Sequence, residues 1–443
     1  MYSPTEVVEV FAWGKRVGAV SLDPFSGLYV FQYNQNWLRS GVELSPFSLP
    51  IARGKRSFAF PSLPKETFKQ LPPMLADSLP DKFGNALIDA ALSDMGIPKE
   101  NVTPLDRLAY MSDRSMGALE FRPPASKAPA EATAIKLSLL VEAARLSLEG
   151  GFGSEGHSAS TIKSIIQVGT SAGGARAKAV IAFNRETGEV RSGHAPLGRG
   201  FDHWLIKLDG VQAGELGDGS HYGRVEYAYH LMAVAANLTM MPCLLIEENG
   251  RAHFMTKRFD RDGATKHHIQ TLCAMRHLDF NAIGVHSYNQ YFDAIDGLGL
   301  SEEERQEAFR RMVFNVMASN CDDHTKNFSF MLRRPEGFDG KTPGKWALTP
   351  AYDLTFAHNP NNPWTKQHLM SVNGKFAGIE RADLLSVADR FLVVDARKII
   401  EEVEAAVARW DEFASIAGVP QAVTERISKN LVLVGKERKW GPS

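Results

Sequence analysis

The period of the apolar residues changes along this chain of 443 residues, and that change limits the folds it can adopt. Residues 6–34 alternate β-forming and polar residues between turn signals, which predicts a small antiparallel sheet. Residues 65–95 carry apolar residues at helical intervals, and strand-like runs fill 166–259 apart from one helical stretch. From about residue 302 to the end, helical patterns predominate. A sheet-rich half followed by a helix-rich half predicts an α+β fold with two lobes.

Residues 116–132 begin with a strand-like run and continue into a linker rich in Pro and Ala, which predicts a domain boundary near residue 125. A chain of this length exceeds one simple core, so we expect two or three lobes. We predict a β-rich N-terminal subdomain at 1–125, a middle segment with a Gly-rich loop at 126–262, and a helical lobe at 263–443.

Composition excludes several classes of protein. The formal net charge is -1, which gives no support for a surface that coats nucleic acid. Cys243, Cys273 and Cys321 lack any metal-ligand spacing, and so few cysteines favour a reduced interior over a disulfide-bonded secreted fold. The first ten residues lack a signal-peptide pattern, and no apolar run approaches the roughly 20 residues that cross a bilayer. We therefore expect a cytoplasmic protein with no membrane partner.

The stretch CDDHTKNFSF, residues 321–330, places two carboxylates, a histidine, a lysine and an amide within six residues. Asp322 and Asn327 are five residues apart, which is the separation of the catalytic Asp and the metal-binding Asn in protein kinases. A carboxylate there can deprotonate an attacking hydroxyl, and an amide oxygen can hold Mg²⁺. His324 or Lys326 could supply the cation that neutralises phosphate charge.

A second metal-binding carboxylate must come from elsewhere in the chain. The run LTPAYDLTF offers Asp353 after a short hairpin-like segment, where a kinase carries its metal-binding Asp. Together with Asp322 and Asn327, it predicts a phosphotransferase site. A solvated capping turn explains the motif as well, because Asp, Asn and Thr favour helix ends and turns.

A nucleotide site also needs a Gly-rich backbone and a buried lysine on a strand. The candidate loop residues are Gly169, Thr170, Ser171, Ala172, Gly173 and Gly174. The loop matches neither a G-x-G-x-x-G nor a Walker A pattern, and a hairpin turn explains it equally. Lys207 lies within an apolar strand-like run, where it either faces the interior or snorkels at an edge. Glu226 is its candidate ionic partner, or else a favourable charge at a helix N-terminus.

Five blocks of the sequence, in order along the chain, resemble the HipA family of bacterial toxin kinases. They are GTSAGGARAKAV, WLIKLDG, KRFDRDG, CDDHTKNFSF and LTPAYDLTF. LADSLPDKFGNALI and SDRSMGALEF are similar to the family's N-terminal region, so the resemblance covers roughly residues 6–420. DDHTKNFSF and TPAYDL are its most specific parts.

The resemblance implies a two-lobed protein-kinase-like fold with a β-rich N-terminal lobe and an all-helical C-terminal lobe. It implies transfer of the γ-phosphate of ATP to serine or threonine hydroxyls of proteins, with Mg²⁺ as cofactor. Asp322 would be the catalytic base, and Asn327 and Asp353 would hold the metal. Lys207 and the Gly-rich loop would contact ATP, whose nucleotide site would lie in 126–262.

Three further roles follow from the resemblance. Lys257, Arg258 and Phe259 would form the hinge beside adenine through backbone groups. Ser171 matches a serine that family members autophosphorylate, which ejects the loop and inactivates the kinase. A dianionic phosphate there would repel the nucleotide. Asp323 stands where some family members carry glycine, so its role is open.

The resemblance also implies a helix-turn-helix antitoxin of the HipB type as partner, with DNA bound indirectly through that complex. The protein substrate would be a translation component such as an aminoacyl-tRNA synthetase, whose phosphorylation arrests growth. The alternatives are a small-molecule kinase, a catalytically silent corepressor partner of the antitoxin, and a metal-dependent hydrolase. The intact catalytic set argues against a silent partner, and a hydrolase leaves Lys207 and the Gly-rich loop without a purpose.

Overall fold

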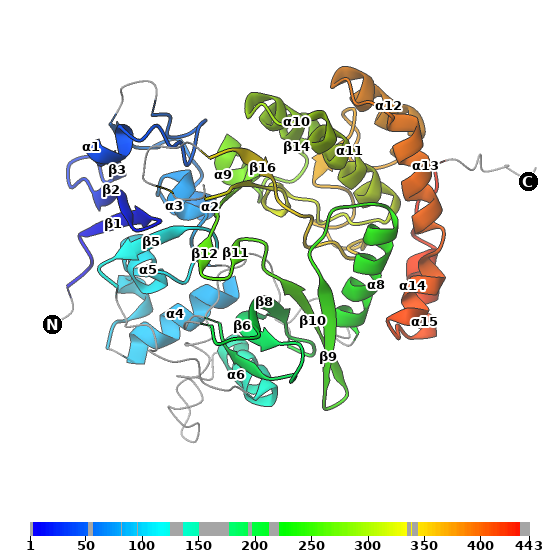
Figure 1. Cartoon of the computed structure of the whole chain (residues 1–443), viewed down its shortest axis with the longest axis horizontal. Coiled ribbons are helices and arrows are strands. Elements are labelled where there is room, and N and C mark those ends of the chain that lie inside the picture. Colours follow the sequence, from blue (N-terminus) through cyan, green and yellow to red (C-terminus); the bar gives the residue numbers. More distant parts are fainter. Residues whose placement is uncertain are drawn as a thin grey trace, which may run out of the picture. The chain divides into compact units, whose positions relative to one another are not determined.

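The computed structural model describes residues 3–51, 56–80, 82–94, 96–124, 136–149, 177–193, 197–211, 221–334, 338 and 344–434. The chain forms two compact units (Figure 1). Unit 1 comprises Met1–Ser220, Leu244–His277 and Phe330–Trp346, and unit 2 comprises His221–Cys243, Leu278–Ser329 and Ala347–Ser443. The division into 1–125, 126–262 and 263–443 stays a prediction.

Unit 1 begins with an antiparallel sheet in the order β4-β3-β2-β1-β5. Its strands are β1 (Val7–Ala12), β2 (Lys15–Leu22), β3 (Tyr29–Tyr33), β4 (Ser57–Phe58) and β5 (Leu119–Arg122). Alternate residues of β1 and β3 are buried, as period-2 patterning requires. Gly18 lets β2 and β3 pair closely, since a Cβ there would lie 2.3 Å from the carbonyl oxygen of Gln32. The antiparallel sheet expected at 6–34 is present.

Helices also form in the described part of unit 1. They are α1 (Gln35–Leu38), α2 (Lys65–Phe68), α3 (Pro73–Ala76), α4 (Lys82–Asp94), the 3₁₀ helix η1 (Lys99–Asn101), α5 (Pro104–Met111), α6 (Leu137–Glu149) and α9 (Leu272–Arg276). The helical pattern at 65–95 is therefore three helices rather than one. Lys69 ends α2 with a φ of 52°, and Pro72 and Pro73 lack the N–H groups that a continuous helix needs.

A second sheet of unit 1 has the order β7-β6-β8-β10-β9. Its strands are β6 (Lys178–Asn184), β7 (Val190–Ser192), β8 (Phe201–Lys207), β9 (Cys243–Glu248) and β10 (Arg251–Lys257). Two smaller groups of strands follow in the chain: the pair β11 (Arg261–Asp262) and β12 (Thr265–Lys266), and the sheet of β13 (His268–Thr271), β15 (Ser329–Leu332) and β16 (Trp346–Leu348).

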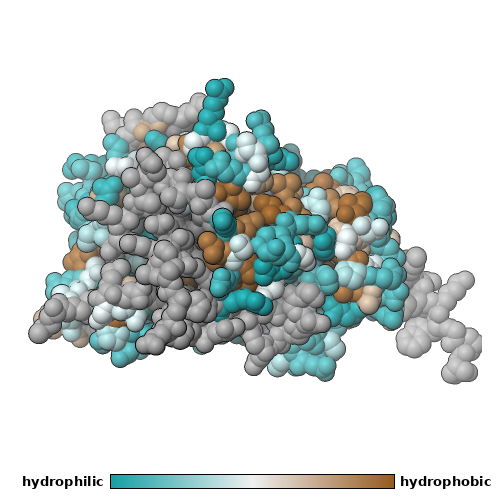
Figure 2. Space-filling view, turned by 90° about the horizontal axis from the view of Figure 1, so that it is seen from below, coloured by the Kyte–Doolittle hydropathy of each residue, from teal (hydrophilic) through white to brown (hydrophobic). Residues whose placement is uncertain are grey.

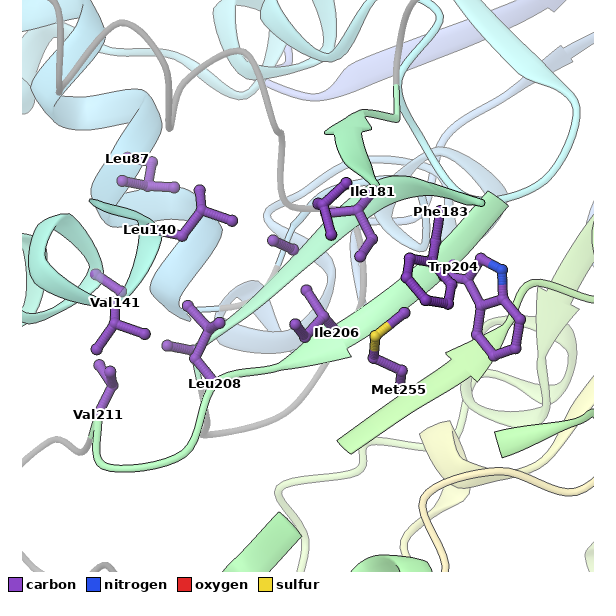
Figure 3. Close-up of a cluster of buried hydrophobic side chains, with 14 residues drawn as sticks. Leu87, Leu140, Val141, Ile181, Phe183, Trp204, Ile206, Leu208, Val211 and Met255 are labelled. Carbon is purple, nitrogen blue, oxygen red and sulfur yellow. The ribbon is translucent and has the colours of Figure 1, made fainter. Parts of the chain in front are cut away.

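One face of the second sheet packs on α4 and α6 through a cluster of buried apolar side chains (Figure 3). Trp204 and Ile206 of β8 are fully buried in it, and the Phe183 ring meets the Trp204 ring edge-on at 5.9 Å. This core fixes the position of β8, the strand that ends at Lys207.

We expect Ile206→Ala to destabilise the protein by about 2–5 kcal/mol, because it removes buried methyl groups and leaves a cavity. Ile416→Ala is the matched control, since that side chain is 62% exposed and its loss should cost no more than about 0.5 kcal/mol. Urea unfolding of both variants measures the difference, and equal midpoints would contradict the assignment of this core.

Unit 2 is mainly helical, with α8 (Tyr222–Ala235), α10 (Tyr288–Gly297), α11 (Glu302–Met317), α12 (Arg381–Arg390), α13 (Ala396–Val407), α14 (Trp410–Ile416) and α15 (Gln421–Ser428). The 3₁₀ helix η2 (Thr325–Asn327) and the parallel pair β14 (His286–Ser287) and β17 (Met370–Ser371) accompany them. α11 packs on α13 and α8 packs on α14, with the Tyr229 ring against those of Phe314 and Trp410. A capping box of Ser301 and Glu304 starts α11, the helix that leads to the predicted catalytic loop.

In the space-filling view, hydrophilic residues take most of the described surface and hydrophobic residues gather in smaller patches (Figure 2). Among the described residues, no helix combines the length and the apolar character needed to cross a membrane.

Candidate functional site

The loop after α11 carries the predicted catalytic residues, and its backbone is held in one shape. The amide Nδ2 of Asn327 donates to the backbone carbonyl of Asp322 at 2.7 Å, and the Asn327 N–H donates to the carbonyl of His324 at 2.8 Å. Because Nδ2 is engaged, Oδ1 of Asn327 remains as the acceptor on the other side of the amide. The loop thus presents one amide oxygen next to Asp322.

Asp322 is the more accessible of the two adjacent carboxylates, with 38% of its side chain exposed. Its Oδ1 accepts a hydrogen bond of 2.6 Å from the Trp364 indole N–H, and Nε2 of His324 lies 3.8 Å from the same oxygen. Partial desolvation raises the pKa of Asp322 above its ordinary value, against the opposing effects of His324 and the Trp364 N–H. The charges of Asp353 and Asp323 raise it further. A carboxylate of raised pKa is a better proton acceptor than a free one.

Asp323 has a different environment, which answers the question that the sequence left open. Its side chain is fully buried, and its oxygens accept hydrogen bonds from the Tyr288 hydroxyl, His368 Nδ1 and the Leu369 N–H at 2.8, 2.9 and 2.7 Å. Both oxygens are therefore engaged in holding the loop to α10 and to the chain before β17. Its burial and its three donors indicate that Asp323 anchors the loop.

His368 is the charged partner of Asp323. Burial opposes a charge on this imidazole, but the Asp323 carboxylate prevails and raises the pKa of His368 to about 10. The network continues through the Asn315 amide, which donates to the Tyr288 hydroxyl at 3.0 Å, and Asn320, which donates to Asn315 at 2.9 Å. The catalytic loop is thus held by a buried ion pair that belongs to a hydrogen-bonded network.

Asp353 lies on a segment tied to the catalytic loop. Tyr352 donates its hydroxyl to the carbonyl of Lys326 at 2.7 Å, and its oxygen lies 2.5 Å from the Ser329 hydroxyl. Asp353 itself has a φ of 57°, a left-handed conformation that turns the chain sharply at this residue. The effect of its charge on the pKa of Asp322 places the two carboxylates in electrostatic reach of each other.

These residues fit a Mg²⁺ site of the kinase type. An amide oxygen from Asn327 and a carboxylate from Asp353 are the hard oxygen ligands that Mg²⁺ prefers, and Mg²⁺ usually completes its shell with water and substrate phosphate. Within the described part of the chain, no three His, Cys, Asp or Glu residues cluster as metal ligands. Two protein oxygens, one from Asn327 and one from Asp353, would suit a metal that also binds water and substrate phosphate.

His324 and Lys326 lie beside aromatic rings. The His324 ring has its centroid 5.5 Å from that of Phe280 and 6.0 Å from that of Trp364. Nζ of Lys326 lies 4.5 Å from the centroid of the Phe280 ring. A contact of His324 or Lys326 with a nucleotide stays a prediction.

Lys207 ends β8 in unit 1 and is buried. Its partner across the ladder is Lys178 at the start of β6, which is also buried. Two buried ammonium groups on adjacent strands are costly unless anionic groups compensate them. Lys178 stands within the GTSAGGARAKAV block. Glu226 is buried in α8 of unit 2, and its pairing with Lys207 stays a prediction.

The predicted hinge residues begin at the last residue of β10. Lys257 pairs with Asp202 at 2.8 Å, and the Arg258 guanidinium binds both oxygens of Asp260 at 2.8 and 2.6 Å. The Arg258 N–H donates to the carbonyl of His203, and Phe259 is half-buried. A role beside adenine stays a prediction for Lys257, Arg258 and Phe259. The predicted loop residues Gly169, Thr170, Ser171, Ala172, Gly173 and Gly174 lie outside the described residues.

Sequence reasoning missed Trp364, His368 and Tyr288, which contact the two aspartates from other parts of unit 2. None belongs to a recognisable motif. The only signal was the Asn- and Pro-rich run HNPNNPW between Asp353 and His368, a composition typical of an ordered turn.

The chain is similar to known proteins in sequence and in fold. Y4dM of Sinorhizobium fredii, a protein provisionally named a kinase, is 27% identical over 170 residues, which are 34% of this chain and 36% of that protein. The alignment thus spans about a third of that relative's length. A chain in the solved complex of the Shewanella oneidensis toxin–antitoxin system HipA and HipB with operator DNA superposes with a TM-score of 0.63. It is 15% identical and is matched over 96% of this chain and 94% of its own length, which shows the fold alone.

Family models match both parts of the chain. The HipA N-terminal domain matches residues 8–122, and the HipA-like C-terminal domain matches residues 170–410. The second match alone covers more than half of the chain, and the predicted family and the predicted kinase-like α+β fold are confirmed. The chain belongs to the HipA family.

Proposed function

We propose that this protein is an ATP- and Mg²⁺-dependent protein kinase that phosphorylates serine or threonine hydroxyls. The observation that carries the proposal is the arrangement of Asp322, Asn327 and Asp353 in unit 2. Asp322, a partly exposed carboxylate of raised pKa, and Asn327 share one loop, which hydrogen bonds join to the segment that carries Asp353.

The residues have separate tasks in this reaction. Asp322 orients the acceptor hydroxyl and takes its proton as the oxygen–phosphorus bond to the acceptor forms and the bond to ADP breaks. Asn327 and Asp353 would hold Mg²⁺, which neutralises phosphate charge when bound. Lys207 would contact the phosphates of ATP. Asp323 and His368 hold the loop in place.

The toxin role and the partners are part of the proposal. A helix-turn-helix antitoxin of the HipB type would bind this chain, and DNA would be bound indirectly through that complex. The solved Shewanella complex, which contains HipA, HipB and operator DNA, supports this. The acceptor would be a translation-related protein such as an aminoacyl-tRNA synthetase, whose phosphorylation arrests growth in the cytoplasm.

Incubation of the purified chain with Mg-ATP, followed by phosphopeptide mapping, tests the activity. We expect phosphate on the chain itself or on an acceptor protein in a lysate. ATP bound without any phosphate on a protein would favour a small-molecule kinase or a silent corepressor instead.

We further propose that autophosphorylation at Ser171 inactivates the kinase. Ser171→Ala is expected to abolish self-inactivation and to keep phosphotransfer to an acceptor, because the catalytic groups of unit 2 are unchanged. Intact-mass measurement over time, with the activity assayed at each point, checks this. If Ser171→Ala were phosphorylated on another residue and lost activity as the wild type does, Ser171 would not be the inactivating site.

A further inference from the structure

The segment of residues 357–369 joins Asp353 to β17 and contacts both aspartates of the catalytic loop. The Ala357 N–H donates to the carbonyl of Ser319, which fixes the start of the segment. At its end, His368 and the Leu369 N–H bind Asp323. Between these anchors lies Trp364, whose indole N–H binds Asp322.

Local turns hold Trp364 independently of Asp322. The side-chain oxygen of Asn362 accepts a hydrogen bond of 2.8 Å from the Trp364 N–H of the backbone, and its carbonyl accepts one from Lys366. The Asn359 N–H donates to the carbonyl of Thr365. An Asn side chain that accepts a hydrogen bond from the backbone N–H two residues later stabilises a turn. These turns, and not only the bond to Asp322, therefore determine the position of the indole.

The two oxygens of Asp322 are therefore not equivalent. Oδ1 is engaged by Trp364 and lies near His324, whereas no described residue donates a hydrogen bond to Oδ2. A hydrogen bond from a donor to an ionised carboxylate is short and orients it strongly. The Trp364 hydrogen bond engages one lone pair of Oδ1, whereas Oδ2 keeps both of its lone pairs for a substrate proton.

We propose that Trp364 is a positioning residue for phosphotransfer, fixing Oδ1 of Asp322 so that Oδ2 faces the acceptor hydroxyl and takes its proton. This inference rests on the proposed kinase function. The proton moves from the acceptor hydroxyl to Oδ2 as that hydroxyl's oxygen bonds to the γ-phosphorus and the bond to ADP breaks. Trp364 itself exchanges no proton and contacts no phosphate in this scheme.

The contact can be tested without any activity. The chain has seven tryptophans, so a protein labelled with ¹⁵N-tryptophan gives few indole N–H signals. Trp364→Phe identifies the signal of Trp364 by its loss. We expect that signal, and not the others, to move in Asp322→Asn, because the charge on its acceptor is removed. A Trp364 signal that stays in place overturns the inference.

Kinetics then test the role. Trp364→Phe is expected to slow phosphate incorporation from saturating Mg-ATP about tenfold. If this variant folds poorly, the indole can be replaced by benzothiophene, which has the same shape and no N–H, and the same loss of rate is expected. The Kd for ATP should remain within twofold, because the metal ligands are intact. Asn361→Ala, an exposed position of the same segment, should change neither quantity.

The outcomes separate this inference from the function it rests on. If a variant that lacks the indole N–H of residue 364 incorporates phosphate at the wild-type rate, the role of Trp364 is overturned and the kinase proposal is unaffected. Equal losses of rate and of ATP affinity also overturn it, since they indicate general damage to the site. A wild-type protein that binds Mg-ATP and never transfers phosphate overturns the proposed function and, with it, the role assigned to Trp364.

Discussion

Asp322→Asn is expected to reduce phosphate transfer by about 10²–10⁴-fold, the usual contribution of a general base, while ATP binding persists. Asparagine keeps the size of the side chain and can still accept the Trp364 hydrogen bond, but it cannot take a proton. Asn327 and Asp353 remain to hold the metal. The rate of phosphate incorporation by mass spectrometry and the Kd for Mg-ATP by calorimetry measure the two effects separately.

Asp353→Asn is the matched comparison, because the same chemical change falls on the proposed metal ligand. We expect this variant to lose ATP affinity specifically in the presence of Mg²⁺. If Asp322→Asn lost ATP binding to the same extent as Asp353→Asn, the assignment of Asp322 as base and Asp353 as ligand would be wrong.

Asp323→Ala is expected to destabilise the protein by about 3–5 kcal/mol, because it leaves the buried His368 imidazolium without its counter-charge. It also leaves the Tyr288 hydroxyl and the Leu369 N–H without their acceptor. Asp296→Ala is the control, since Asp296 pairs with Arg305 on the same unit but is 46% exposed. Exposed pairs contribute about 0–1 kcal/mol. Midpoints of urea unfolding compare the two variants.

The stability that Asp323 provides should depend on pH. The pKa of His368 is about 10 in the folded protein and about 6.5 in an unfolded chain. The contribution of the pair is therefore fully present below about pH 6.5 and is lost as pH rises toward 10. The stability difference between wild type and Asp323→Ala should shrink over that range. A difference that stays constant from pH 6.5 to 10 would show that His368 is neutral in the folded state.

The adjacent residues Asp322 and Asp323 illustrate what the sequence could and could not predict about the site. Spacing to Asn327 distinguished Asp322 from Asp323, but the reason for two adjacent carboxylates could not be read from the motif. The answer depends on Tyr288 and His368, which lie 35 and 45 residues away from Asp323 along the chain. Only the folded chain brings them together and makes one aspartate an anchor and its neighbour a candidate base.

The sequence by itself determined the family, the α+β class and the order of the motifs, because strand and helix periods and the spacing of chemical groups are local properties. The tertiary structure decided what lies around those groups: the burial of Asp323, the charge of His368, the pairing of Lys178 with Lys207 and the hydrogen bond from Trp364 to Asp322. Burial, pKa and hydrogen-bond partners depend on residues distant in the chain, and no local pattern encodes them.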